Sequence, residues 1–172
     1  MEPIFLTGFM GAGKTTIGKA LGKRLALTVF DTDELIEAAL AKSIKDIFAE
    51  EGEPAFRRYE TCVLKKVTWD NVIVTTGGGI VINEVNRKWM KEHGTIVYLH
   101  CSPEEVFRRL AKDTERPLIQ GKNLDKMSAL FKQRQPLYEE ADYVLDTNGK
   151  SVGAVVEKIA EQMINEEPCR LY

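Results

Sequence analysis

A glycine-rich turn near the N-terminus limits the possible folds of this chain more than any other feature. Residues 8–15 read Gly-Phe-Met-Gly-Ala-Gly-Lys-Thr and match the phosphate-loop pattern G-x-x-x-x-G-K-[ST] at every fixed position. An apolar run, residues 3–7, precedes the turn, and residues 16–25 carry apolar side chains at helical spacing. An ordinary glycine turn at the end of a strand is the alternative, which the flanking strand and helix disfavour. The motif therefore predicts a site for a nucleoside triphosphate.

Each fixed residue of this turn has a chemical reason. Glycines let successive backbone N–H groups converge on phosphate oxygens at the positive end of the following helix. Lys14 supplies a mobile charge for the β- and γ-phosphates, and the Thr15 hydroxyl can ligate the magnesium ion that bridges them. The motif predicts six nucleotide-binding residues: Gly11, Ala12, Gly13, Lys14, Thr15 and Thr16.

Length and composition narrow the class of protein. The 172 residues suit one domain, residues 1–172. With 24 basic and 26 acidic residues the net charge is −2, so neither a nucleic-acid partner nor a membrane surface is indicated. Cys62, Cys101 and Cys169 lack C-x-x-C spacing, which predicts neither a disulfide framework nor a zinc site. The apolar stretches are too short to span a bilayer and no secretory leader is recognisable, so we expect a cytoplasmic protein, by default a monomer.

Apolar runs alternate with segments of helical period along the chain. This alternation predicts an α/β fold, in which a parallel sheet is covered by helices. The five expected strands are residues 4–7, 28–31, 72–75, 95–100 and 143–146. Small polar residues predict the helix N-caps Ser43, Asn83, Ser102 and Ser151. Residues 113–125 have no period and read as a loop, and a loop of this length is typical of an active-site lid or, alternatively, is a plain connector.

Two carboxylates follow the second expected strand. In an open parallel sheet, ligands bind outside the carboxyl ends of the strands. Asp31 could hold magnesium through water, and Asp33 could receive the proton of an acceptor hydroxyl. Alternatively, Thr32 or Asp33 only caps the next helix. Asp146, after the fifth strand, is a rival to Asp31 for the magnesium role.

Three glycines, residues 77–79, follow the third expected strand. They leave a surface that a ligand can approach closely, although a permissive turn is the alternative. Arg57 and Glu60 are neighbours at i,i+3 on a helix expected over residues 53–67. Taken alone, this pair reads as a solvated ion pair, and Arg116 and Arg134 read as surface residues.

Together these motifs resemble the shikimate kinase family, small phosphate-loop enzymes of aromatic amino-acid biosynthesis with a fold similar to that of nucleoside monophosphate kinases. The resemblance covers nearly the whole chain. It rests on residues 8–16, Asp31, Asp33, Gly52, Glu53, Phe56, Arg57, Glu60, residues 77–79, Arg116, Pro117, Leu118, Arg134, Tyr138 and Ala141.

The resemblance implies a three-layer α/β/α domain with five parallel strands in the order 2-3-1-4-5. It implies ATP-dependent phosphorylation of the shikimate 3-hydroxyl, with ATP and magnesium as cofactors and shikimate as the small-molecule partner. Asp33 would contact the shikimate hydroxyls and act as the catalytic base, Arg57 and Arg134 would grip its carboxylate, and Gly78 would approach it through the backbone. Another small-metabolite kinase, such as a gluconate kinase, and a non-catalytic nucleotide-binding regulator are the alternative functions.

The resemblance also assigns the phosphate side. Lys14 and Arg116, the latter on the lid, would stabilise the transferring phosphate, and Thr15 with Asp31 would hold magnesium. Glu60 would orient Arg57. Three residues, Phe48, Phe56 and Leu118, would line the acceptor pocket, and two, Arg109 and Lys150, would lie near adenine.

Overall fold

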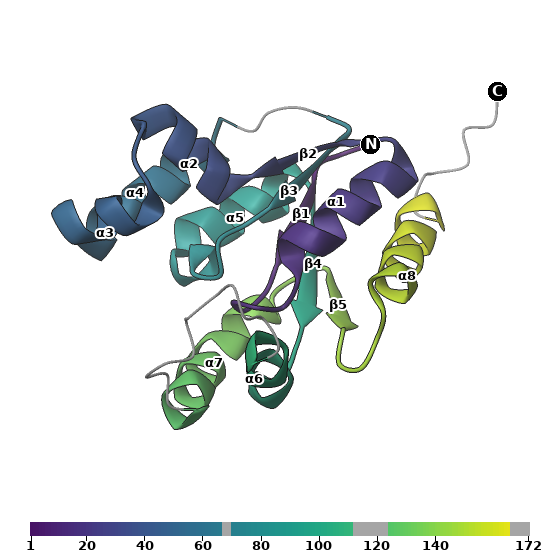
Figure 1. The fold of residues 1–172 in the computed structure, drawn as a ribbon. Helices are drawn as coiled ribbons and strands as arrows, with labels where there is room; N and C mark the ends of the chain where they lie inside the picture. Colours follow the sequence, from purple (N-terminus) through teal and green to yellow (C-terminus); the bar gives the residue numbers. More distant parts are fainter. Residues whose placement is uncertain (67–69, 112–123, 166–172) are drawn as a thin grey trace.

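A computed structural model describes residues 1–66, 70–111 and 124–165 (Figure 1). Five parallel strands form one sheet in the order β2-β3-β1-β4-β5, which confirms the predicted order. The strands are β1 (Ile4–Thr7), β2 (Thr28–Asp31), β3 (Val72–Thr75), β4 (Thr95–His100) and β5 (Tyr143–Asp146). Their bounds are those predicted from the apolar runs.

The first strand lies in the centre of the sheet. Phe5 of β1 is opposite Val74 of β3 on one side and Ile96 of β4 on the other. The chain therefore leaves β1 where the strand order reverses, which is the place where open α/β sheets bind ligands. The phosphate-loop sequence follows β1 directly, so the fold puts it at this switch point.

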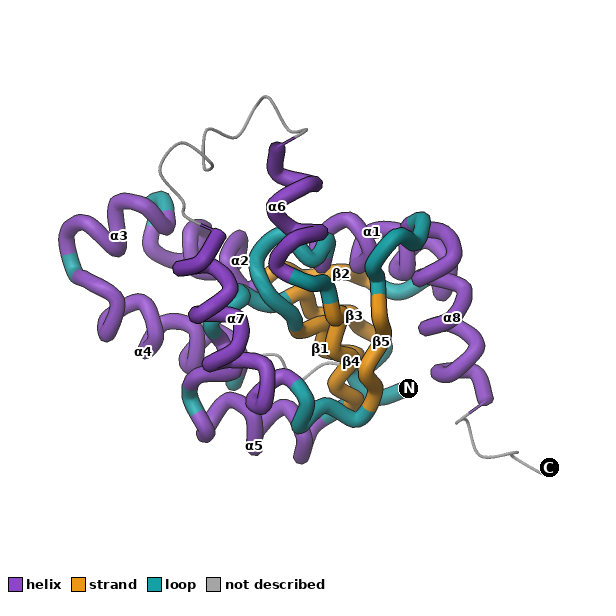
Figure 2. The backbone as a smooth tube through the Cα atoms, turned by 90° about the horizontal axis from the view of Figure 1, so that it is seen from below, coloured by secondary structure: helices purple, strands orange, loops and turns teal. Residues whose placement is uncertain are grey.

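Helices cover both faces of the sheet. On one face, α1 (Lys14–Leu25) packs beside α8 (Val152–Asn165). Seen along the other axis, α5 (Glu84–His93) and α7 (Leu124–Tyr138) lie on the opposite side of the strands from α1 and α8 (Figure 2). The helix α6 (Pro103–Ala111) packs against α7. One apolar core joins these layers, and it includes an edge-to-face contact between Phe9 and Phe131 with ring centroids 5.6 Å apart.

Three further helices form a projection beside β2. They are α2 (Thr32–Leu40), α3 (Ile44–Glu50) and α4 (Gly52–Leu64). A second apolar cluster of Ile36, Ile47, Phe56 and Val63 holds them together. The helix expected over residues 53–67 ends at Leu64, and residue 67 lies outside the described residues. This projection carries Asp33, Arg57 and Glu60 to the edge of the sheet.

The predicted helix caps are confirmed at four positions. Side-chain oxygens of Ser43, Asn83, Ser102 and Ser151 accept backbone N–H bonds at 3.1, 3.0, 3.3 and 3.2 Å.

At α2 the alternative interpretation, in which Thr32 or Asp33 only caps the helix, is wrong. Neither Thr32 nor Asp33 caps the helix, because Asp31 does so by accepting from the Asp33 N–H at 3.0 Å. A carboxylate two residues before that N–H reaches it without strain, which lets the helix begin at Thr32.

The predicted lid, residues 113–125, lies mainly outside the described residues. Its last two residues are described and belong to the first turn of α7, so the prediction is wrong for Leu124 and Asp125. No helix of the described chain is long and apolar enough to span a membrane. Cys62 and Cys101 are free thiols, and Cys169 is outside the described part.

Candidate active site

The phosphate loop joins β1 to α1 with a backbone that glycine makes possible. Gly11 and Gly13 have φ values of 76° and 92°, a region that side chains disfavour. Gly13 caps α1 without any side-chain hydrogen bond, so the first N–H groups of the helix remain available. A helix N-terminus with open N–H groups fits an anion, and the residues present therefore fit a nucleotide phosphate.

Carbonyl oxygens of the phosphate loop hold the side chain of Lys14 over the loop. Its Nζ donates to the carbonyl oxygens of Gly8 at 2.8 Å and of Phe9 at 3.0 Å. Burial lowers the pKa of Lys14 to about 8, and the charges of Asp33 and Asp31 partly oppose this effect. The ammonium thus lies where phosphate oxygens would meet the loop.

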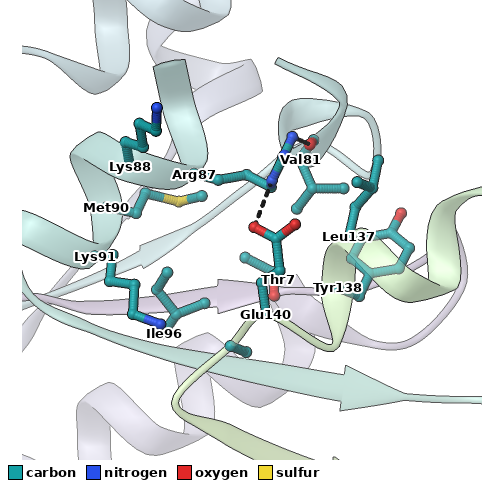
Figure 3. Close-up of a pocket in the computed structure, with 11 residues that line it drawn as sticks. Thr7, Val81, Arg87, Lys88, Met90, Lys91, Ile96, Leu137, Tyr138 and Glu140 are labelled. Atoms are coloured by element: carbon teal, nitrogen blue, oxygen red, sulfur yellow. Dashed lines mark hydrogen bonds and ion pairs between the residues drawn. The ribbon is translucent and has the colours of Figure 1, made fainter. Parts of the chain in front are cut away.

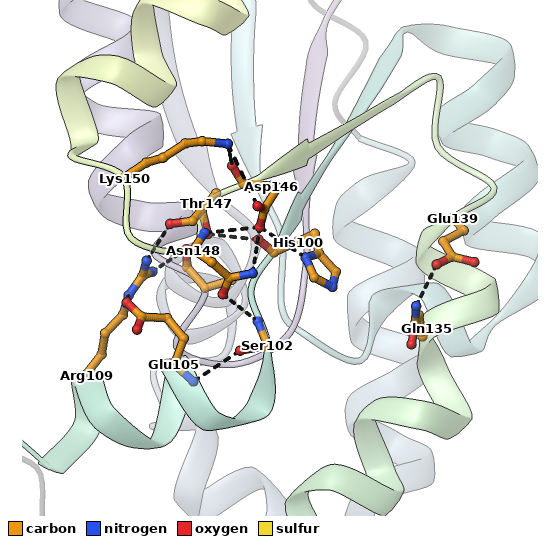
Figure 4. A network of polar contacts seen from close by, with 11 residues as sticks. His100, Ser102, Glu105, Arg109, Gln135, Glu139, Asp146, Thr147, Asn148 and Lys150 are labelled. Carbon is orange, nitrogen blue, oxygen red and sulfur yellow. Dashed lines mark hydrogen bonds and ion pairs between the residues drawn. The ribbon is translucent and has the colours of Figure 1, made fainter.

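Asp31 lies next to Thr15. Its Oδ2 accepts from the Thr15 hydroxyl at 3.1 Å and from the Thr75 hydroxyl at 2.6 Å. Asp146 is at the opposite edge of the sheet, where its carboxylate contacts His100 and Asn148 (Figure 4). The fold therefore places Asp31, and not Asp146, beside the Thr15 hydroxyl.

These oxygens fit a magnesium ion only as part of its coordination. Thr15 and Asp31 offer the hard oxygen donors that this ion prefers. Among residues 1–66, 70–111 and 124–165 no cluster of three or more His, Cys, Asp or Glu side chains could hold a metal. Magnesium is usually held by one or two protein oxygens together with substrate phosphates and water, which matches this arrangement.

Asp33, in the first turn of α2, carries an unpaired carboxylate oxygen. Its Oδ1 is buried and has no hydrogen-bond partner among the described residues. Burial, and then the charge of Asp31, raises the pKa of Asp33 to about 6, while Lys14 and Arg57 act in the opposite direction. Because buried polar atoms are rarely left unpaired, this oxygen marks a place for a ligand.

Glu60 is buried and pairs with a partly exposed Arg57, so the interpretation of this pair as solvated is wrong. Arg57 Nη1 donates to Glu60 Oε2 at 2.6 Å, and Nη2 donates to Glu53 Oε1 at 2.7 Å. The exposed fraction of the side chain is 0% for Glu60 and 20% for Arg57. Burial raises the pKa of Glu60, which the hydrogen bond from Arg57 opposes.

The glycine triplet is required by close approach of charged groups. A Cβ on Gly77 would lie 2.8 Å from Glu60 Oε1 and 2.9 Å from Asp33 Oδ1. A Cβ on Gly79 would lie 2.3 Å from Arg57 Nη1. Real Cβ atoms do not approach other atoms this closely, so a side chain would displace the charged groups. A permissive turn alone does not explain these glycines.

Gly78 is contacted by two side chains of α7. Its carbonyl oxygen accepts from Arg134 Nη1 at 3.4 Å and from the Tyr138 hydroxyl. Arg134 is thus beside the glycine triplet and is not a free surface residue. Sequence reasoning gave Tyr138 no role; its i,i+4 spacing from Arg134 on one helix was the available signal.

A cavity of about 480 Å³ lies between the phosphate loop and α6. Gly11, Ala12, Gly13, Thr16, Arg109, Thr147 and Lys150 are among its lining residues. Arg109 Nη2 donates to the Thr147 carbonyl at 2.8 Å and Lys150 Nζ to the Asp146 carbonyl at 2.6 Å (Figure 4). The cavity continues from the phosphate loop and is the candidate site for the base of a nucleotide.

An aromatic pair flanks Arg57. The rings of Phe48 and Phe56 have centroids 4.7 Å apart, and the Arg57 guanidinium lies 5.4 Å from the Phe56 centroid. Phe48 is 39% exposed, so its ring is open to solvent beside Phe56 and Arg57. Arg116 and Leu118, the remaining predicted site residues, lie outside the described residues.

A central phosphate loop, with carboxylates and arginines gathered beside it, defines a phosphate-loop kinase. A model of the family described as shikimate kinase matches residues 10–164. The chain belongs to the shikimate kinase family.

Individual relatives agree with this assignment. A curated shikimate kinase of Bacillus cereus (strain AH187) is 54% identical over 166 residues, which cover 96% of this chain and 100% of the relative. Among solved structures, shikimate kinase from Acinetobacter baumannii in complex with shikimate has a TM-score of 0.88 and 36% identity, with coverage of 97% of this chain and 95% of that chain. The enzyme from Aquifex aeolicus has a TM-score of 0.83 and 35% identity, with coverage of 95% and 96%.

Proposed function

We propose that this chain transfers the γ-phosphoryl group of ATP to the 3-hydroxyl of shikimate, forming shikimate 3-phosphate and ADP. Family membership supports the reaction, and the Acinetobacter baumannii relative is described in complex with shikimate. The observation that carries the proposal is the position of Asp33. Its carboxylate is influenced both by Lys14 on the nucleotide side and by Arg57 on the acceptor side.

Arginine and glycine residues bind the acceptor in this proposal. Shikimate carries a planar carboxylate, which the guanidinium groups of Arg57 and Arg134 match in shape and charge. The backbone at Gly78 can approach the acceptor closely, since no side chain intervenes. Phe48 and Phe56 supply an apolar wall for the ring, with Leu118 proposed as a third contributor.

Asp33 accepts the proton of the reacting hydroxyl. The hydroxyl oxygen forms a bond to the γ-phosphorus as the bond from that phosphorus to the β,γ-bridging oxygen breaks, and ADP leaves. With a pKa near 6, Asp33 is ionised at neutral pH and can receive the proton. In a loose transition state the same carboxylate orients the hydroxyl before the proton moves.

Positive charge stabilises the transferred group. Lys14 contacts the β- and γ-phosphates, and Arg116 is proposed to reach the same oxygens from the segment 113–125. Thr15 and Asp31 would hold magnesium, which would supply positive charge to neutralise the charge that develops on the phosphates. Arg109 and Lys150 are proposed to lie beside the adenine in the 480 Å³ cavity.

We also propose that the chain acts as a single-domain monomer in the cytoplasm. Its near-balanced charge and its lack of a predicted disulfide framework support this setting. Light scattering on the purified protein should give a mass near 19.4 kDa, and twice that mass would contradict the monomer.

A coupled assay of ADP release tests the reaction. The purified protein is supplied with ATP, magnesium and one candidate acceptor: shikimate, gluconate or a nucleoside monophosphate. We expect turnover only in the assay in which shikimate is the acceptor. Turnover with gluconate instead would favour the other small-metabolite kinase. Tight ATP binding without turnover on any acceptor would favour a nucleotide-binding regulator.

A further inference from the structure

Side chains of two helices hold the turn that follows β3 by its carbonyl oxygens. The Ile80 carbonyl accepts from Asn86 Nδ2 at 3.1 Å. The Val81 carbonyl accepts from Arg87 Nη1 at 2.8 Å, and Figure 3 shows Arg87 between Val81 and Glu140. Because Glu140 accepts from Arg87 Nε at 2.8 Å, α5 is tied to the chain after α7 at the same point. The Ile80 and Val81 carbonyls of this turn are therefore held by side chains of α5.

Tyr138 provides the corresponding contact at Gly78. It is the last residue of α7, its exposed fraction is 1%, and its hydroxyl donates to the Gly78 carbonyl. Burial raises the pKa of Tyr138 to about 12, so the hydroxyl remains a donor at neutral pH. Its ring stacks on Tyr98 with centroids 5.0 Å apart and an interplanar angle of 13°. Both the position and the protonation of the hydroxyl are thus set by packing.

Fixing the Gly78 carbonyl also fixes the next N–H group. No peptide bond of the described residues is cis, and in a trans peptide the carbonyl and the following N–H point in opposite directions. The Gly79 N–H therefore points away from Tyr138. No atom of the described chain accepts a hydrogen bond from it, and the Arg57 guanidinium occupies the place next to Gly79 that a Cβ would take. This N–H is available to a ligand bound beside Arg57.

Tyr138 also changes what Arg134 can do. Arg134 Nη1 contacts the same carbonyl at 3.4 Å, which is long for a hydrogen bond. If Arg134 were its only donor, turning the guanidinium toward a bound carboxylate would leave a partly buried carbonyl unpaired. With the Tyr138 hydroxyl in place, Gly78 keeps a donor while Arg134 binds the ligand.

We propose that Tyr138 is a positioning residue for acceptor binding, which holds the Gly78 carbonyl so that the Gly79 N–H and the Arg134 guanidinium can both bind the acceptor carboxylate. This inference rests on the proposed function and deepens it. Tyr138 acts through Gly78 and Arg134, at the end of the acceptor that does not react. Its effect therefore falls on acceptor affinity and leaves the phosphoryl transfer step unchanged.

The test compares Tyr138→Phe with Tyr98→Phe. Both substitutions remove one hydroxyl from the same stacked pair, but the buried Tyr98 hydroxyl has no hydrogen-bond partner among the described residues. In steady-state assays we expect Tyr138→Phe to raise the KM for shikimate about 2- to 10-fold, with kcat and the KM for ATP within about twofold of wild type. Tyr98→Phe should leave all three values unchanged.

Hydrogen exchange gives a second readout that needs no acceptor. The N–H groups of Ile80 and Ile82 donate within the turn to the carbonyls of Gly77 at 3.1 Å and Gly79 at 3.0 Å. Loss of the Tyr138 hydroxyl should loosen this turn and speed exchange of both amides severalfold. Tyr98→Phe should exchange like wild type.

The two readouts separate this inference from the reaction itself. Equal shikimate KM values and equal exchange in the two variants would overturn the role of Tyr138. So would a Tyr138→Phe protein with a lower melting temperature and a lower kcat at unchanged shikimate KM, because that result describes a purely structural residue. Absence of shikimate-dependent turnover in the wild type would overturn the proposed function, and the exchange comparison would still decide whether Tyr138 holds the turn.

Discussion

The nucleotide side and the acceptor side of the active site are built in different ways. The phosphate loop is one run of consecutive residues, and its binding groups are backbone N–H groups together with the Lys14 ammonium. The acceptor side takes Asp33 from α2, Arg57 from α4, the glycine triplet after β3 and Arg134 from α7. Consecutive residues can thus form a phosphate site, whereas the acceptor site exists only after segments that are distant in the sequence have packed together.

The two sides also differ in charge. Burial lowers the pKa of the Lys14 cation, and burial raises the pKa of the carboxyls of Asp33 and Glu60. On the acceptor side, Asp33 Oδ1 and Glu60 Oε1 are buried without partners in the described chain. The acceptor side therefore holds polar groups that a ligand can satisfy, at a cost to the stability of the unliganded fold.

The largest effect is expected from Asp33→Asn, which alters only the acceptor side. Loss of the base should lower kcat by roughly 10²–10⁴-fold, while ATP affinity stays within a few-fold of wild type. Asp146→Asn is the matched control, because it removes a strand-end carboxylate at the other edge of the sheet. Steady-state kinetics and ATP titration measure both values; an equal loss of ATP affinity would mean that the two sides are not separable.

A smaller effect is expected from Gly79→Ala. The new Cβ would lie 2.3 Å from Arg57 Nη1 and would displace the guanidinium. Loss of a charge-assisted contact to the acceptor should raise the KM for shikimate by about 10- to 100-fold at unchanged KM for ATP. Gly153→Ala serves as control, since a Cβ there meets nothing within 4 Å. If Gly79→Ala had the KM for shikimate of the wild type, Arg57 would not be a residue that binds the acceptor.

The pH dependence of kcat/KM for ATP should show two pKa values, one from a group on the acceptor side and one from a group on the nucleotide side. Asp33, with a pKa near 6, must be ionised, and Lys14, with a pKa near 8, must be protonated. Activity should therefore fall about tenfold per pH unit below pH 6 and again above pH 8. In Asp33→Asn the acid limb should disappear from the residual activity and the alkaline limb should remain. Persistence of the acid limb would assign it to another group.

The smallest effect concerns stability. A pKa raised from 3.8 to about 6 means that the folded state binds a proton that the unfolded state has lost, so stability falls as the pH rises between these values. Above pH 6 the full cost of the ionised carboxylate is present. Asp33→Asn should then be more stable than wild type by about 1 kcal/mol, a gain that vanishes below pH 4. Urea unfolding at pH 7.5 and pH 3.5 measures the difference, and a gain at both pH values would require another cause.

The same contrast explains how much could be predicted from the sequence. The bounds of the central strands β1, β3 and β4 agree with the structure because each of these strands is buried on both faces and reads as an apolar run. The phosphate loop was predictable because its residues are consecutive. The burial of Glu60 was not predictable, since a charged residue three positions from an arginine on a helix indicates a solvated pair, and this burial depends on where Gly77 lies.

Two other features could not be derived from the sequence for a similar reason. The alternative interpretation of Thr32 or Asp33 as the cap of α2 does not hold, because several polar residues in a row offer the same capping chemistry and only the backbone geometry selects Asp31. For Tyr138 the only local signal is its i,i+4 spacing from Arg134, because its partner Gly78 is far away in the sequence. Single-residue roles of this kind follow from tertiary contacts alone.

The lysine of the phosphate loop bears on how fast nucleotides are captured. Since the Lys14 ammonium donates to the carbonyls of Gly8 and Phe9, the loop keeps its shape through a bond to itself. When phosphate oxygens arrive, the Lys14 ammonium exchanges its carbonyl acceptors for phosphate acceptors. The turn does not have to refold before the nucleotide binds. Capture of a polyphosphate should accordingly be set by diffusion and long-range attraction, and the slow step of the cycle belongs to a later event.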